Sequence, residues 1–261
     1  MPIVTLTTDF GLEDHYVAVM KAVIISAAPK VELVDVTHRV PKFNVAHGAM
    51  ILRQIVEWFP PGTAHLVVVD PGVGGDRAVL AFRYNGQFVI CPDNGLITLV
   101  HRTWPFETAR RIEQSAPARS PGSATFQGRD VMAPAAAFLA KGGAIDQLGA
   151  PVDAVELLDL TASVLLPDGT IRGEVVYVDS FGNLVTNISR GDVSGAFAQR
   201  RVAQVFLNDT QVGPIRRTYS EVEPGTGVAL FGSSDLLEVA VNRGVAAKVY
   251  GVQAGARVVV R

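Results

Sequence analysis

The sequence predicts an N-terminal α/β domain with a central, mostly parallel sheet over residues 1–150, a connecting segment over 151–165 and a smaller antiparallel β-barrel domain over 166–261. Two patterns carry this prediction. Through the first half, short β-branched runs alternate with segments of helical periodicity, which is typical of βαβ units. After residue 150 the chain changes to β-type runs separated by Gly, Asn, Asp and Ser, with no amphipathic helix longer than a few turns. A chain of 261 residues is long enough for each part to bury its own core.

The elements of the first half follow in order from these patterns. Strand-type runs occur at IVTLTTD, VELVDVTH and AHLVVVD, and helical periods over residues 14–28 and 44–58 separate them. In VLAFRYNGQFVICPDNG, the Asn-Gly pair at 85–86 predicts a hairpin between two strands. We expect a helix over 96–104, then the loop QSAPARSPGSATF, then a helix in RDVMAPAAAFLAKGG that ends at a glycine pair. Pro134 must lie in the first turn of that last helix or kink it.

The second half begins with the connection APVDAVELLDLTASVLLPDG, which is followed by strand-type runs from GEVVYVD onward. The Pro-Asp-Gly stretch at 167–169 predicts a turn directly before the first strand. The sequence contains no repeat of fixed period and no low-complexity tract.

Charge and composition restrict the class of partner. The formal net charge is −2 and the basic residues are scattered, so we expect neither nucleic acid nor an anionic membrane as a partner. The single cysteine, Cys91, excludes an intramolecular disulfide and fits a reducing cytoplasm; we expect it to be a buried small hydrophobe rather than a nucleophile. The N-terminus lacks the pattern of a signal peptide, and YVAVMKAVIISAAP is too short and too interrupted to span a bilayer. These features predict a soluble, cytoplasmic protein with a small-molecule ligand.

Three acidic residues occupy places where ligands bind in open parallel sheets, outside the carboxyl ends of strands. Asp9 ends the first strand, Asp70 ends the third and Asp93 follows the hairpin. Each also suits a turn or a helix N-cap, which is the favoured interpretation of Asp93. In DPGVGGDR, the Gly-rich turn lets Arg77 fold back onto Asp70, in a pair that suits a structural salt bridge as well as a site. The same stretch matches neither the phosphate-loop nor the dinucleotide-binding motif.

Histidines give no sign of a metal site. His15, His38 and His47 lie near the early acidic residues, but none shows the spacing of a metal-binding motif such as HExxH. We therefore expect no metal. His38 follows the second strand, where it is either a loop residue or the wall of a pocket.

The stretch VDSFGNLVTNISR gathers Asp179, Phe181, Asn183 and Asn187 around Gly182. Asn can pair with the edge of adenine and Phe can stack on a flat ring, which together suit a nucleoside pocket. SFGN also suits a plain hairpin turn, and the residues alone favour the turn.

Six blocks follow one another along almost the whole chain: TTDFG, VVDPGVGGDR, PDNG, TFQGRD, DSFGNLVTN and LLEVAVNRG. Together they resemble the S-adenosyl-L-methionine (SAM) hydrolase family, the SAM hydroxide adenosyltransferases, which are related to fluorinase and chlorinase. The resemblance implies attack by water or hydroxide on the ribose C5′ of SAM, with adenosine and L-methionine as products. SAM is then the substrate, and no cofactor is implied. Because the sulfonium is already a good leaving group, neither a metal nor a general acid is required. The resemblance also implies a homotrimer whose site lies between the N-terminal domain of one subunit and the C-terminal domain of its neighbour.

Matching of these blocks places nine residues around the substrate. The resemblance implies that Asp9 holds the ribose diol, because a carboxylate can accept two hydrogen bonds, and that Phe43 packs near the sugar. It assigns Asp14, Asp179 and Ser233 to the amino-acid end of methionine, and Phe181 and Asn183, with Tyr219 and Asn242 nearby, to the adenine pocket. The SFGN stretch is one residue shorter than the form found in the halogenases.

The family's Asp-Arg-His set around the attacking water is matched here by Asp70, Arg77 and Gln127. Glutamine can donate a hydrogen bond to water and accept one from it, but it cannot take up a proton near neutral pH as histidine does. Three explanations stay open: a natural variant that relies on Asp70 and Arg77, an engineered substitution that slows turnover, or a protein that binds its ligand without rapid chemistry. We expect retained but weakened hydrolysis.

Three other functions are weighed against hydrolysis. Against SAM-dependent halogenation stand Asp70, at a position that is aromatic in halogenases, and Gly128, which lacks the hydroxyl of the fluorinase. There is also no long insertion between Arg77 and Phe88. A carboxylate beside the nucleophile would repel a halide by several kcal/mol. Gln127 keeps a non-catalytic SAM-binding protein open, and the acidic strand ends keep open a metal-dependent phosphoesterase.

Overall fold

A computed structural model describes residues 1–113, 123–197 and 203–261 of the chain. The contacts within the chain divide it into two units, Met1–Asp159 and Leu160–Arg261. Most of the loop predicted at QSAPARSPGSATF lies outside the described residues.

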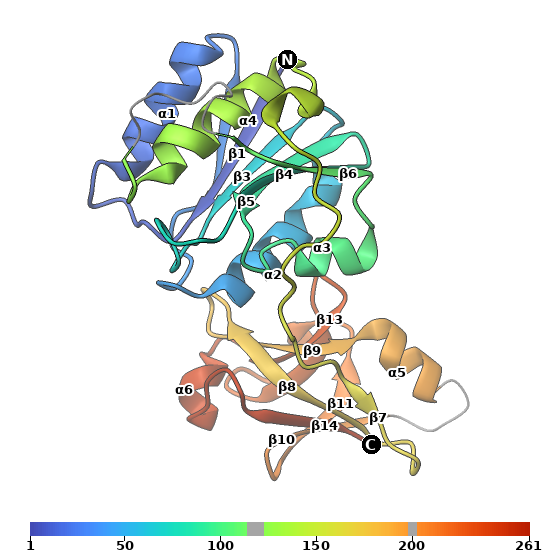
Figure 1. Cartoon of the computed structure of the whole chain (residues 1–261). Coiled ribbons are helices and arrows are strands. Elements are labelled where there is room, and N and C mark those ends of the chain that lie inside the picture. Colours follow the sequence, from blue (N-terminus) through green and yellow to red (C-terminus); the bar gives the residue numbers. More distant parts are fainter. Residues whose placement is uncertain (114–122, 198–202) are drawn as a thin grey trace. The chain divides into compact units, whose positions relative to one another are not determined.

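The first unit is built on a six-stranded mixed sheet in the order β2-β1-β3-β5-β4-β6 (Figure 1). Strands β2, β1, β3 and β5 are parallel, and β4 and β6 are antiparallel to their neighbours. The bounds are β1 Ile3–Thr8, β2 Glu32–Thr37, β3 Ala64–Val68, β4 Val79–Tyr84, β5 Gln87–Pro92 and β6 Thr108–Arg111. The predicted central, mostly parallel sheet is confirmed.

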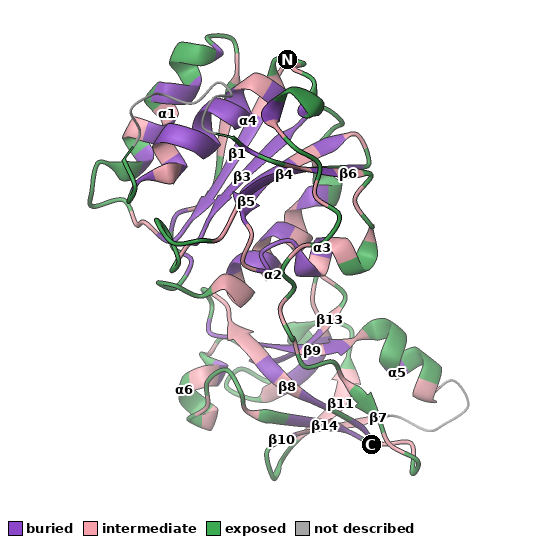
Figure 2. Ribbon diagram, in the orientation of Figure 1, coloured by how far each residue is buried: buried purple, intermediate pink, exposed green. Residues whose placement is uncertain are grey.

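Helices cover both faces of this sheet (Figures 1 and 2). On one face α1 and α4 contribute apolar side chains to a core that includes Leu6 and Leu66, and on the other face α2 and α3 contribute to a core that includes Val67 and Phe82. The bounds are α1 Tyr16–Ala27, α2 Val45–Ile55, α3 Thr98–Thr103 and α4 Ala133–Ala140, with 3₁₀ turns η1 Val56–Trp58 and η3 Ile145–Leu148. The expected helices at 14–28, 44–58 and 96–104 are confirmed, with ends that move by a few residues.

A π-helical turn, η2 (Gly128–Met132), leads directly into α4. Pro134 lies in the first turn of α4, as one of the two predicted alternatives requires. Proline fixes φ at about −65° and has no backbone N–H, both of which the first turn of a helix tolerates. Single π turns within helices occur frequently at functional sites.

The hairpin predicted at 85–86 joins β4 to β5. Asn85 and Gly86 both have positive φ, 46° and 71°, as the two central residues of a type I′ turn require. Cys91 lies buried on β5, as predicted, and is a free cysteine.

The second unit is a β-barrel, as predicted. Its strands follow the order β14-β10-β11-β12-β13-β9-β8, and pairing between β14 and β8 closes the barrel. All pairs are antiparallel except β11 and β12, which are parallel. The bounds are β8 Ile171–Val178, β9 Leu184–Ser189, β10 Gln204–Leu207, β11 Thr210–Arg216, β12 Gly227–Phe231, β13 Leu236–Val241 and β14 Arg257–Val260, with α5 Arg190–Phe197, η4 Tyr219–Glu221 and α6 Ala246–Tyr250.

Residues 151–165, expected as a connection, contribute pairings to both units. Pro151 and Leu157 form isolated bridges to Arg110 and Gly95 in the first unit. Strand β7 (Val164–Leu165) pairs with β8 in the second unit. The turn at 167–169 therefore lies between β7 and β8 rather than before the first strand.

Candidate active site

The order of the strands creates a natural binding place in the first unit. The chain runs from β1 to β2 on one side and then returns to β3 on the other side of β1, so the direction of winding reverses between β1 and β3. In open α/β sheets, ligands bind outside the carboxyl ends of the strands at such a reversal. Asp9 directly follows β1 and Asp70 follows β3 by two residues, so both acidic side chains belong to this edge.

Asp70 and Arg77 form a bidentate ion pair. Arg77 Nε donates to Asp70 Oδ1 at 3.0 Å, and Arg77 Nη2 donates to Asp70 Oδ2. The side chains are 5% and 12% exposed, respectively. The intervening loop turns back through Gly74, whose φ of 82° is accessible to glycine at low cost. Such a fork-to-carboxylate pair fixes the orientation of both groups, which makes it a rigid wall for a site.

The segment before Gln127 approaches this loop closely at Gly74, and the residue after Gln127 packs against β3. A Cβ on Gly74 would lie 3.0 Å from the carbonyl oxygen of Ala124, and a Cβ on Gly128 would lie 3.4 Å from Val68 of β3. Gln127 immediately precedes the π turn, and its Oε1 is buried with no hydrogen-bond partner among the described residues. A buried acceptor without a partner costs free energy, so this one suits a bound water or ligand.

Asp9 holds the loop that carries Phe43. The backbone N–H of Phe43 donates to Asp9 Oδ2 at 2.9 Å, and the Asp9 side chain is buried. Phe43 has a φ of 65°, uncommon for a bulky residue, and its ring is 68% exposed. Strained residues held by their surroundings occur frequently at ligand sites. Asp14 lies exposed in the segment before α1.

Asp93 and Cys91, at the end of β5, take structural roles. Asp93 Oδ1 accepts a hydrogen bond from the N–H of Glu156 at 2.9 Å, so Asp93 is a structural residue that ties down a distant segment rather than the turn or helix N-cap residue that was favoured. Burial, with the nearby carboxylates of Asp93 and Asp70 adding to it, raises the pKa of the Cys91 thiol. A thiol that stays protonated is a poor nucleophile.

In the second unit, the SFGN stretch forms the tight turn between β8 and β9. Asp179 Oδ1 accepts from the N–H groups of Phe181 and Asn183 at 2.9 and 2.8 Å, and Asp179 Oδ2 accepts from Asn183 Nδ2 at 3.0 Å. The turn leaves the Phe181 ring 76% exposed at its tip. The stretch is thus the turn that the residues alone favoured, and this turn exposes the aromatic ring of Phe181.

Tyr219 and Glu238 form a second polar group in this unit. Tyr219 Oη donates to Glu238 Oε2 at 3.2 Å. Burial raises the pKa of Tyr219 to about 12, and the carboxylates of Glu238 and Asp179 add to this shift. Burial also raises the pKa of Glu238. The Glu238 carboxylate occupies the space that a Cβ on Gly232 would take, directly before Ser233 in the exposed turn between β12 and β13.

Asn242 follows β13 and has a structural partner of its own. Its Nδ2 donates to the carbonyl of Val222 at 2.7 Å and so ties the end of β13 to the segment after η4.

Alternation along β13 is a sequence signal that points to Glu238, which the resemblance did not include. In LLEVAVNRG, Leu237, Val239 and Val241 alternate into the barrel core, which leaves Glu238 on the other face of β13.

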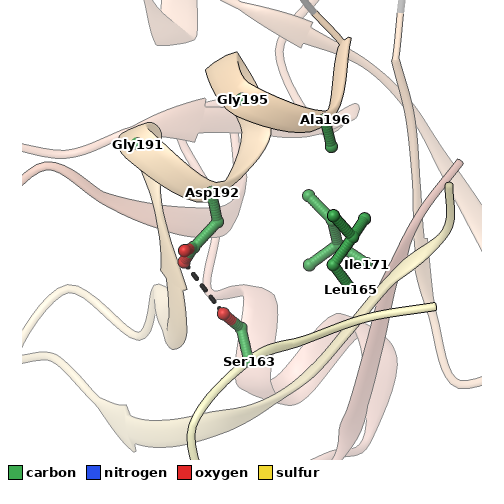
Figure 3. A pocket seen from close by; sticks show the side chains of 7 residues that line it. All are labelled: Ser163, Leu165, Ile171, Gly191, Asp192, Gly195 and Ala196. Carbon is green, nitrogen blue, oxygen red and sulfur yellow. Dashed lines mark hydrogen bonds between the residues drawn. The ribbon is translucent and has the colours of Figure 1, made fainter.

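A pocket of about 270 Å³ lies elsewhere in the second unit, between α5 and the β7–β8 region (Figure 3). In it Ser163 Oγ donates to Asp192 Oδ2 at 2.9 Å, and Leu165, Ile171 and Ala196 line the other side. None of the site residues predicted from the sequence lines this pocket.

Two absences hold for residues 1–113, 123–197 and 203–261. Among them no group of three or more His, Cys, Asp or Glu side chains is placed to hold a metal ion. Within the same ranges no helix is long and apolar enough to cross a membrane.

Comparison with known families matches both parts of the chain. Residues 4–149 match the SAM hydroxide adenosyltransferase N-terminal domain, and residues 173–259 match the corresponding C-terminal domain. The chain belongs to the SAM hydroxide adenosyltransferase family. The resemblance drawn from the six sequence blocks is therefore confirmed.

Individual relatives of the chain agree with this family membership. An (R)-S-adenosyl-L-methionine hydrolase from Thermus thermophilus is 42% identical over 259 residues, 95% of each chain. A fluorinase from Nocardia brasiliensis is 26% identical over 291 residues, covering 100% of this chain and 97% of the relative. The crystal structure of an uncharacterized conserved protein from Thermotoga maritima matches with a TM-score of 0.92 at 34% identity over 99% of each chain.

Proposed function

We propose that this chain is a SAM hydrolase that converts S-adenosyl-L-methionine and water into adenosine and L-methionine. The observation that carries the proposal is the rigid Asp70–Arg77 pair at the reversal between β1 and β3, with the buried Gln127 acceptor held beside its loop. The hydrolase from Thermus thermophilus, 42% identical to this chain, supports the same reaction.

In the proposed reaction a water oxygen attacks the ribose C5′ in line with the C–S bond. The C5′–O bond forms, the C5′–S bond breaks, and its electron pair passes to the methionine sulfur, which loses its positive charge. The water releases one proton to solvent. Since the leaving group departs neutral, catalysis depends on holding the water and C5′ in line. SAM is the substrate, and the proposal requires no cofactor.

The residues of the first unit bind the ribose and position the attacking water. Asp9 uses Oδ2 for Phe43, which leaves Oδ1 to accept from the ribose hydroxyls. The Gln127 Oε1 accepts one hydrogen of the attacking water, and the Asp70–Arg77 pair fixes its other side. Phe43 packs against the sugar.

We assign the remaining predicted residues to the rest of the substrate. Asp14, Asp179 and Ser233 face the amino-acid end of methionine, while the exposed Phe181 ring stacks on adenine with Asn183, Tyr219 and Asn242 around it. Because Asp179 and Asn183 already hold the turn together, part of their contribution is to present Phe181 in one orientation.

The proposal includes a cytoplasmic homotrimer whose site lies between the first unit of one subunit and the second unit of its neighbour. Exposed apolar side chains support this: Leu12, Phe43 and Val73 follow the ends of β1, β2 and β3, and Phe181, Tyr219 and Val245 lie in turns of the barrel. An interface between subunits would cover these side chains.

Asp70 favours hydrolysis over halogenation. Unit charges 4 Å apart repel by about 4 kcal/mol at an effective dielectric near 20. The guanidinium of Arg77 offsets part of this repulsion, so an assay with chloride is needed to separate the two reactions.

The test incubates purified protein with the R and S sulfonium epimers of SAM separately, with and without chloride and a chelator, and measures nucleoside products by chromatography. We expect adenosine, faster from the R epimer that the name of the Thermus relative specifies, and no effect of either additive. The matched control is Asp70→Asn, which should lose most of this activity. 5′-Chloro-5′-deoxyadenosine would identify a halogenase, chelator sensitivity a metal enzyme, and binding without any product a SAM-binding protein.

A further inference from the structure

His38 is buried in the first unit and lies within reach of two side chains. Its Nδ1 lies 2.9 Å from Thr8 Oγ1, at the end of β1, and its Nε2 lies 3.1 Å from Asp35 Oδ1, on β2. The other oxygen of Asp35 accepts from Lys21 Nζ of α1 at 2.5 Å. The ring therefore lies between β1 and β2, and Asp35 links it to α1. This group is next to the end of β1, which Asp9 directly follows.

The hydrogen bonds of this group run in one direction. Thr8 Oγ1 accepts from the backbone N–H of Phe10 at 3.2 Å, so its own hydrogen is free to bond His38 Nδ1. His38 Nε2 then carries the ring hydrogen; it lies 3.1 Å from Asp35 Oδ1 but has no hydrogen-bond partner among the described residues. Burial alone would raise the pKa of the Asp35 carboxyl, but Lys21 and the adjacent His38 outweigh it and lower that pKa, which keeps a carboxylate next to the ring.

The same histidine lies where two loops are bound to each other. The carbonyl of His38 accepts from the N–H of Gly11 at 2.7 Å, and the carbonyl of Thr8 accepts from the N–H of Val40 at 3.2 Å. The bond from the Phe43 N–H to Asp9 closes the far end of this contact. The orientation of Asp9 and the strained backbone of Phe43 thus depend on the contact between the two loops.

We propose that His38 is a positioning residue for nucleoside binding: through Thr8 and the Phe10 N–H it holds the loop of Asp9 against the loop of Phe43. The inference rests on the proposed function, which places the substrate sugar at Asp9 and Phe43. The sequence allowed a loop residue or a pocket wall at His38; in the structure His38 directly follows β2 and is buried, with its ring bonded to Thr8.

The chain contains a matched control in a second buried Thr–His pair. His65 Nδ1 lies 2.9 Å from Thr5 Oγ1, and His65 Nε2 lies 2.8 Å from Gln87 Oε1. Thr5 lies three residues before Thr8 on the same strand, and His65 pairs with it across β1 and β3. This pair makes the same kind of bond but is not joined to the loops of Asp9 and Phe43.

The experiment compares His38→Gln, His38→Asn and His65→Gln in the full-length protein. Gln can place an amide at the position of Nε2 and so loses the threonine bond, whereas Asn can accept at the position of Nδ1 and keeps that bond. Adenosine affinity is measured by calorimetry, SAM hydrolysis by KM and kcat, and amide hydrogen exchange at Phe10 and Phe43 by NMR.

We expect His38→Gln to weaken adenosine binding about tenfold, the size typical of one lost hydrogen bond, and to speed exchange at both amides. His38→Asn should stay within about threefold of wild type, and His65→Gln should lower the melting temperature without changing adenosine affinity. Unchanged affinity and exchange in His38→Gln would overturn the inference, as would equal affinity losses in His38→Gln and His65→Gln. If wild type neither binds adenosine nor hydrolyses SAM, the proposed function fails, and the exchange rates still decide whether His38 fixes the two loops.

Discussion

Gln127 decides how the proton of the attacking water is handled. Its Oε1 is a buried acceptor without a partner among the described residues, so it can hold a water but cannot keep a proton. The Asp70 oxygens both accept from Arg77, which makes Asp70 a group with fixed geometry rather than a mobile base. Positioning is therefore expected to contribute more to the rate than proton transfer.

Replacing Gln127 with histidine should restore proton acceptance. General-base catalysis contributes on the order of 10²-fold or more, so we expect kcat in Gln127→His to rise towards that factor. Activity in this variant should fall below a pH of about 6.5, where the imidazole becomes protonated, and this fall should be absent from wild type. Steady-state rates from pH 5.5 to 8.5 test this.

The near-isosteric Gln127→Met is the control for the histidine variant, because it keeps the volume and removes the acceptor. We expect it to lose activity. If Gln127→Met matches wild type, the amide does not hold the water, and the assignment of Gln127 is wrong.

Phe43 combines a strained backbone with an exposed ring, so replacing it should change both the stability of the protein and its binding of adenosine. Its φ of 65° costs on the order of 1–3 kcal/mol in a non-glycine residue. Phe43→Gly should therefore raise the free energy of unfolding by about 1 kcal/mol, after the entropy that glycine adds to the unfolded chain, while weakening adenosine binding. Phe43→Ala loses the same ring but keeps the strain. It should therefore weaken adenosine binding without raising the free energy of unfolding, as measured by urea denaturation. Equal stability of the two variants would contradict this account.

For single residues, the sequence predicted a role correctly where the residue type and its position allow few other roles. Asp9 and Asp70 follow strand ends, and Arg77 follows a Gly-rich turn, so the ion pair could be predicted from order along the chain. The partners of His38 could not, because Thr8 and Asp35 lie on separate strands and only their register brings them to the ring.

Among the elements, β3 and β5 are tied together by a buried polar chain at His65. Gln87 Nε2 donates to two backbone carbonyls, so its Oε1 faces His65 and fixes the hydrogen on Nε2. Burial lowers the pKa of His65 to about 4, against the opposing effect of Gln87. The folded state thus holds the ring neutral.

This network should make the first unit sensitive to acid. His65 titrates near 6.5 in the unfolded chain and near 4 in the folded one, so its stabilisation is complete above pH 6.5 and falls as pH drops towards 4. Between pH 7.5 and 5 the loss should be about 2 kcal/mol. Urea denaturation at both pH values measures it, and His65→Gln should show a correspondingly smaller difference. An identical pH dependence in the two proteins would refute this.

The loop from β3 to β4 offers a test of how elements meet at the site. An alanine at Gly74 would combine an unfavourable φ with a Cβ 3.0 Å from Ala124, and so push the loop away from the segment that carries Gln127. Gly62 is the matched control, since its φ of 85° is similar and its Cβ would meet nothing within 4 Å. Both substitutions should cost about 1 kcal/mol of stability, and only Gly74→Ala should lower kcat. Equal activity in the two variants would separate the loop from catalysis.

Elements were predictable where local chemistry decides them. The Asn-Gly pair at 85–86 fixes its hairpin because both residues tolerate positive φ. The π turn at Gly128–Met132 was not predictable, because its bonds depend on packing against α1 and β3 rather than on a helix-breaking residue.

At the scale of the whole molecule, the change of pattern near residue 150 predicted two units, the second of them a barrel, but no local pattern predicted which strands pair to close it. Closure depends on pairing between β8 and β14, which are separated by most of the second unit in the sequence. Contacts between such distant segments, or between subunits, leave little trace in local periodicity.

The proposed shared site therefore needs a test that reads association and chemistry together. Asp70→Asn disables the part of the site from the first unit, and Phe181→Ala disables the part from the second. If each site combines the first unit of one subunit with the second unit of its neighbour, co-expressed and purified mixed trimers regain intact sites. Random assembly of equal amounts should restore about a quarter of wild-type SAM hydrolysis, because each site has about one chance in four of drawing both intact parts. Sedimentation must show trimers in the same preparations. If each chain forms its own site, every site in the mixture carries one defect, and activity stays at the level of the separate variants.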